Sequence, residues 1–161
     1  MKISRTMLGL ALAVAMTAGA APVRLDDSAS PRARIDAQPR WLHTGEGLSN
    51  PELLNAMVAD VANLEVRLNT SRFVGKRARI YLVFPEFVPG IRSRSGIRAE
   101  WRTRGTLLPG TASPGDRALV YDGAITKPSL GDFLDLTLFL DARHLDRGAR
   151  FEPAFELELA Q

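Results

Sequence analysis

The sequence FLDLTLFLD at residues 133–141 decides the fold class of this chain. Leucines stand at positions 134, 136, 138 and 140, and this two-residue repeat places all four side chains on one face of a β-strand. Burying each leucine contributes roughly 1.5–3 kcal/mol in transfer terms. Because a shift by one residue would expose the whole row, the pattern predicts a β-strand with a well-determined register.

A second stretch, FEPAFELEL at residues 151–159, has the same repeat. Its apolar residues at 151, 153, 155, 157 and 159 share one face, and the glutamates at 152, 156 and 158 face water. Pro153 fits the beginning of a strand or an edge strand, because proline has no N–H for the ladder of a central strand. We expect this stretch to be the last strand of the domain.

Further short strands are predicted upstream, at residues 64–68, 78–84, 97–103 and 117–121. Glycine and proline turns, such as Pro109-Gly110 and Pro114-Gly115, separate several of them. Many short strands between such turns are typical of an antiparallel all-β domain. The sequence therefore predicts a mainly β protein, an antiparallel two-layer, immunoglobulin-like β-sandwich over residues 49–161. The alternative is a small β-barrel with an interior ligand site.

One short N-terminal helix is expected ahead of the strands, at about residues 50–62. Ser49 and Glu52 have the spacing of a capping box. The apolar residues at 53, 54, 57, 58 and 61 then recur at a helical period. We expect this apolar stripe to pack on the sheet.

The first 48 residues are predicted to lie outside the folded domain. Residues 1–20 resemble a secretory signal peptide, with Lys2 and Arg5 ahead of a ten-residue apolar stretch and Ala18-Gly19-Ala20 as the cleavage pattern. The alternative, a membrane anchor, usually needs about 20 strongly apolar residues. We expect cleavage to leave no transmembrane segment. Residues 21–48 contain three prolines and no apolar period, which predicts a flexible N-terminal arm.

The composition excludes several kinds of chemistry. The chain has 161 residues and no cysteine, which removes disulfides, thiolate zinc sites and thiol nucleophiles. It has two histidines, and none of the common nucleotide-binding or hydrolase motifs is present. We therefore expect no cofactor and no metal. A cysteine-free domain with a signal peptide suits an exported protein of a bacterial cell envelope, in the periplasm or outside the cell.

Basic residues gather in the middle of the chain. Residues 67–104 hold ten basic and two acidic side chains, whereas the segments on either side are acidic. The candidate site is a group of arginines around one aromatic residue, namely Arg92, Arg94, Arg98, Trp101, Arg102 and Arg104. On a strand over 97–103, Arg98 and Arg102 share the outward face and could bind phosphate or carboxylate groups. The alternative is that these arginines pair across strands with Glu152, Glu156 and Glu158.

These observations favour a non-enzymatic exported β-domain that binds another envelope protein or serves as a structural or assembly component. The alternative is an anion- or glycan-binding module that uses the Arg98/Arg102 strand on an anionic polysaccharide. Nucleic acid is a weaker partner, because the chain without its signal peptide has a formal charge of only +1. A hydrolase would need a carboxylate pair, and nothing in the sequence selects one.

Overall fold

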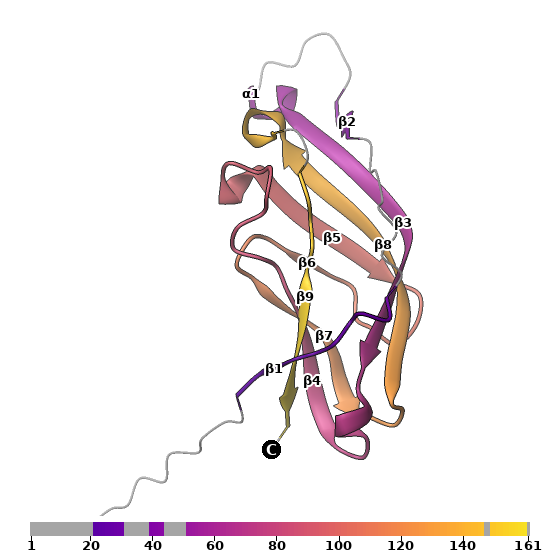
Figure 1. Ribbon diagram of the computed structural model, residues 1–161. Coiled ribbons are helices and arrows are strands. Elements are labelled where there is room, and N and C mark those ends of the chain that lie inside the picture. The colour runs from indigo at the N-terminus through magenta and orange to yellow at the C-terminus, as the bar shows by residue number, and fades with distance from the viewer. Residues whose placement is uncertain (1–20, 31–38, 44–50, 147–148, 161) are drawn as a thin grey trace, which may run out of the picture.

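The computed structural model describes residues 21–30, 39–43, 51–146 and 149–160, and it is built almost entirely from antiparallel strands (Figure 1). One sheet has the strand order β1-β9-β4-β7, and the other has the order β2-β3-β8-β5-β6. The strands are β1 (Val23–Arg24), β2 (Arg40–Trp41), β3 (Ala56–Asn69), β4 (Arg77–Val83), β5 (Ile97–Thr103), β6 (Gly110–Ala112), β7 (Arg117–Ala124), β8 (Ser129–Asp141) and β9 (Ala154–Leu159). The helical elements are short: α1 (Pro51–Leu54), η1 (Ser71–Phe73), η2 (Arg94–Gly96) and η3 (Ala142–His144).

The two sheets confirm the predicted antiparallel β-sandwich. Within the described residues they are separate sets of paired strands and not one closed sheet, so the alternative of a small barrel is wrong. The pair β4–β7 lies in one layer and the pair β5–β8 in the other. Immunoglobulin domains join strands B–E and C–F in the same way. In an immunoglobulin domain the first strand lies in the sheet of B and E, and the last strand lies in the sheet of C and F. Here β3 lies in the sheet of β5 and β8, and β9 lies in the sheet of β4 and β7, so these two positions are exchanged.

The core lies between the layers and is made by the alternating residues that the sequence singles out. The predicted leucine row of β8 faces inward, where Leu134 is 3% exposed. Leu157 of β9 and Ile80 of β4 are fully buried opposite each other. Strand β5 has the predicted bounds, and its inward residues, which include Trp101, are buried. Residues of both sheets therefore form one apolar core.

The expected helix over residues 50–62 is wrong. Helix α1 has only four residues, and strand β3 begins at Ala56. Met57 and Val61 point into the core, while Val58 faces the other side of the sheet, where it is also buried. Val58 lies opposite Arg40 of β2, so a neighbouring strand contributes to its burial. A strand buried on both faces produces an apolar pattern that also fits a helix. No helix in the described part of the chain is long and apolar enough to cross a membrane.

The expectation of a flexible arm over residues 21–48 is wrong for the two stretches that the structure describes, residues 21–30 and 39–43. Strand β1 pairs with β9, and Leu25 is 4% exposed in the core. The chain then crosses to the other layer, where the Asn69 N–H donates to the Asp26 carbonyl at 2.9 Å. Strand β2 pairs with the beginning of β3. This part of the N-terminal segment thus closes one side of the sandwich. The predicted signal peptide lies outside the described residues.

Candidate anion-binding site

The structure divides the predicted arginine group among several places. Trp101 is a core residue: its side chain is 2% exposed and its indole N–H donates to the Leu108 carbonyl at 3.0 Å. Arg92 lies at the edge of the loop before β5, where its Nε is 3.2 Å from a carboxylate oxygen of Asp146. The remaining four arginines lie at the two ends of β5. Arg94 and Arg98 are at its beginning, and Arg102 and Arg104 are at its end.

The arginines at the end of β5 face an aspartate of the neighbouring strand. Arg104 donates through Nη2 to both carboxylate oxygens of Asp135, at 2.9 and 2.8 Å. The same carboxylate accepts the N–H of Asn63 at 3.0 Å, in the bulge of β3. Arg102 lies opposite Asp135 in the strand register. The bond from Asn63 and then the bond from Arg104 hold the pKa of Asp135 below its ordinary value of 3.8. Asp135 thus supplies the hydrogen-bond partner of Arg104 at the end of β5.

The beginning of β5 lines an open cleft of about 290 Å³. Its walls come from η2, β5, the beginning of β3 and the end of β8, together with the loop that follows β6. Two of the predicted arginines lie in it, beside two hydroxyl groups and one aromatic ring. The polar and aromatic residues of the lining are Arg94, Ser95, Arg98, Ser113, Phe139 and Asp141. We call this site the β5 cleft.

Strand pairing positions Arg98 in the β5 cleft. Arg98 lies opposite Phe139 of β8, and its guanidinium carbon is 4.3 Å from the centre of the Phe139 ring. A cation over an aromatic face is attracted by the negative charge of that face. On its other side Arg98 forms an ion pair with Glu100, two residues further along the same face of β5. Phe139 therefore orients a guanidinium whose ionic partner lies at the surface.

A tight turn holds the Arg94 side chain in the same cleft. Its Nη2 donates to the Pro114 carbonyl at 3.1 Å, and its Nη1 is 3.0 Å from a carboxylate oxygen of Glu86. Gly115 follows Pro114 with φ +92°, a conformation that glycine adopts without strain. A Cβ on Gly115 would lie 2.3 Å from Nη2 of Arg94. The positive φ favours glycine at this position, and a side chain there would push the Arg94 guanidinium away.

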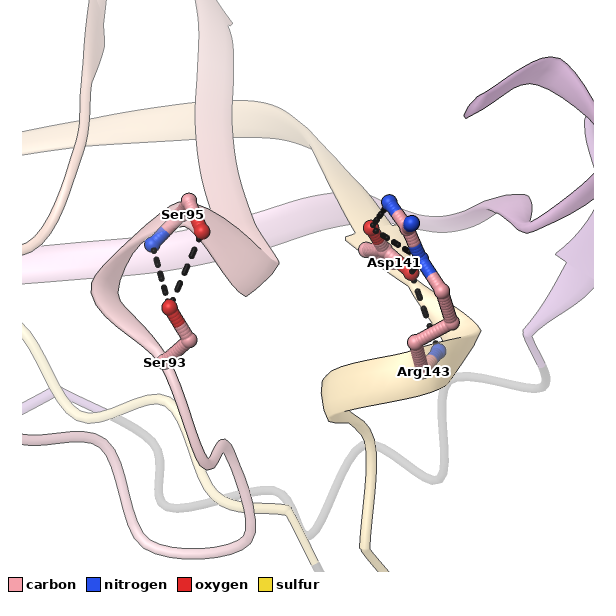
Figure 2. A network of polar contacts seen from close by, with 4 residues as sticks. All are labelled: Ser93, Ser95, Asp141 and Arg143. Carbon is pink, nitrogen blue, oxygen red and sulfur yellow. Dashed lines mark hydrogen bonds and ion pairs between the residues drawn. The ribbon is translucent and has the colours of Figure 1, made fainter. Parts of the chain in front are cut away.

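Two turns border the β5 cleft (Figure 2). The Ser93 hydroxyl accepts the Ser95 N–H at 3.3 Å and lies 2.9 Å from the Ser95 hydroxyl. Across from it, Arg143 donates to Asp141 through both its backbone N–H, at 2.9 Å, and its guanidinium, at 2.6 Å. The side-chain bond from Arg143 is the main reason that the pKa of Asp141 lies below its ordinary value. The acidic residue of the cleft is therefore already neutralised by its own turn.

The alternative, in which the β5 arginines pair with the glutamates of the last strand, is wrong. Strand β9 belongs to the other sheet, where Glu156 and Glu158 bind Arg117 at 3.1 and 2.9 Å. The partners of the β5 arginines come from their own sheet and from the 84–91 loop. Exposed pairs of this kind contribute about 0–1 kcal/mol each. Because the Glu86 and Glu100 side chains are 75% and 47% exposed, an anionic ligand can replace them at little cost.

The sequence does not single out the two serines and the aromatic residue of the lining, Ser95, Ser113 and Phe139. Only Ser95, which lies between two of the predicted arginines, could have been suspected from its neighbours. Within the described residues, no group of three or more histidine, aspartate or glutamate side chains could hold a metal ion. The arrangement presents two guanidinium groups and two hydroxyls, which are groups that bind carboxylates or phosphates, and Phe139 orients one of the guanidinium groups. Comparisons with protein-family models, curated proteins and solved structures find no match for the chain.

Proposed function

We propose that this protein is an exported, non-enzymatic β-sandwich of the cell envelope that binds an anionic component through the β5 cleft. The observation that carries the proposal is the convergence of Arg94 and Arg98 on one open cleft with the hydroxyls of Ser95 and Ser113. Guanidinium groups bind carboxylates and phosphates through two parallel hydrogen bonds. The hydroxyls can donate to the remaining oxygens of the same group.

An acidic polysaccharide fits this cleft better than a small metabolite. The cleft is shallow and open to solvent, so a ligand would be held by repeated surface contacts and not by enclosure. Export, proposed from the signal-peptide pattern of residues 1–20, would bring the domain among the acidic polymers of the envelope. The neighbouring carboxylates favour discrete binding over general attraction, because they leave no broad cationic field around the site.

The experiment compares two arginines on the same face of the same strand. Calorimetric titration with polygalacturonate, a carboxylate polymer, is performed on the mature protein and on Arg98→Gln. The matched control is Arg102→Gln, which removes the same charge outside the cleft. We expect Arg98→Gln to weaken binding at least tenfold, because a hydrogen bond to a charged group contributes about 1.5–3 kcal/mol.

The control separates a site from a charge effect. Arg102→Gln is expected to change the affinity less than threefold. Equal losses in both variants would mean that the polymer responds to net charge alone. Such a result, or the absence of saturable binding to the wild-type protein at low salt, would contradict the proposed function.

A further inference from the structure

An exposed aromatic residue lies on the 84–91 loop, outside the β5 cleft. Phe87 is 74% exposed, the highest value among the exposed large apolar residues of the described chain. It lines an open depression of about 550 Å³ together with two prolines and two charged residues. The lining is Pro85, Phe87, Pro89, Arg150 and Glu152. A single exposed apolar residue is common at a protein surface, so what marks Phe87 is the loop that holds it and the charged groups beside it.

The loop that presents Phe87 is firmly anchored on both sides of it. Phe84 and Val88 point into the core and are 1% and 4% exposed. The Ile91 N–H donates to the Val88 carbonyl at 3.0 Å. Gly90 has φ +83°, and a Cβ there would lie 2.5 Å from the Cα of Ala149. The loop thus packs backbone to backbone on the segment before β9, and Phe87 is held in place and not merely left in a loose turn.

The same anchoring presents Arg150 and Glu152 beside the ring. The Arg150 N–H donates to the Pro89 carbonyl at 3.0 Å. Between the two charged residues, Phe151 turns inward and packs on Phe84 with ring centroids 4.6 Å apart. Since neighbours alternate in an extended segment, Arg150 and Glu152 both point away from the core. Neither forms an ion pair with another described residue, so their polar groups are open to a ligand.

From this arrangement we infer that the depression binds a neutral pyranose of a polysaccharide, stacked on Phe87. The axial C–H groups of a glucose-type ring carry a small positive charge, and they pack on the negative face of an aromatic ring. The Arg150 guanidinium donates to a hydroxyl oxygen, and the Glu152 carboxylate accepts from a hydroxyl. Because one cation and one anion flank the ring, the site has no net charge and selects neutral sugars. It uses none of the lining residues of the β5 cleft.

The test is an NMR titration of the mature protein with cellohexaose, a neutral β-linked glucose polymer. We expect saturable shifts of the Phe87, Arg150 and Glu152 amides and a loss of affinity of at least tenfold in Phe87→Ala. Phe133→Ala is the matched control, because Phe133 is 44% exposed on β8 and lies outside the depression. Glu152→Gln keeps the side-chain shape and is expected to weaken binding at least threefold.

Several results would overturn this inference. The first is the absence of saturable amide shifts with cellohexaose. The second is an equal loss of affinity in Phe87→Ala and Phe133→Ala. The third is that a decaproline peptide binds at Phe87 and cellohexaose does not. The last result would assign the depression to a proline-rich peptide, which also docks on aromatic and proline surfaces. Binding of polygalacturonate at the β5 cleft is measured separately with the arginine variants. Failure at one site therefore leaves the other proposal to its own test.

Discussion

Replacing Asp132 by alanine should destabilise the sandwich by about 2–4 kcal/mol, because a buried N–H loses a charged acceptor. Asp132 is 5% exposed, and its carboxylate accepts the N–H of Leu107 at 2.8 Å and that of Phe133 at 2.7 Å. The first bond ties the loop after β5 to β8 across a separation of 25 residues. Each hydrogen bond to a charged group contributes about 1.5–3 kcal/mol, and relief of the buried charge offsets part of the sum.

The assay is equilibrium unfolding in guanidinium chloride, followed by circular dichroism of the strands. Asp132→Asn is the matched control: its amide oxygen can still accept the Leu107 N–H, so we expect it to lose about half as much stability. Asp122→Ala, in an exposed cross-strand pair with Arg79, should change the free energy of unfolding by less than about 0.5 kcal/mol. An Asp132→Ala protein as stable as Asp122→Ala would refute the argument that this carboxylate fastens the loop.

Two further predictions concern the bulge of β3 and the response to acid. Asn63 has φ +57°, a conformation that a β-branched residue rarely adopts. Asn63→Val should therefore lower the free energy of unfolding by about 1–2 kcal/mol, whereas Asn63→Gly should change it by less than about 0.5 kcal/mol. Equal thermal stability of the two variants would contradict this explanation. The pKa values of Asp135 and Asp141 are lowered in the folded protein, so their stabilisation is complete above the unfolded value near 3.8 and is lost as the pH falls below it. The guanidinium midpoint should therefore decline below about pH 4, and the double variant Asp135→Asn/Asp141→Asn should show a shallower decline.

The sequence correctly predicts the strands that are buried on one face only. The leucines of β8 and the bounds of β5 follow from alternation, because each outward residue is polar or remains at the surface. Residues 56–62 break this rule, since Val58 is buried on the outer face opposite β2. The pairing of β2 with β3 is not encoded in any local pattern, and neither is the entry of Leu25 into the core.

The candidate site was predictable only along its own strand. Arg98 could be placed on the outward face of β5 from the period of two, and the inward position of Trp101 follows from the same period. The ring beneath Arg98 comes from β8, 41 residues later in the chain, and Ser113 comes from the loop after β6. Such neighbours depend on which strands lie side by side, and no local pattern in the sequence specifies that order.

The most direct test of the proposed binding site is an amide NMR titration of the protein with trigalacturonate. We expect saturable changes in the amide chemical shifts of Ser95, Arg98 and Ser113. These changes should be absent in Arg98→Gln. The amide signals of Arg102 and Arg104 should not shift. Shifts that spread evenly over the exposed arginines, or that centre on the end of β5 beside Asp135, would contradict it.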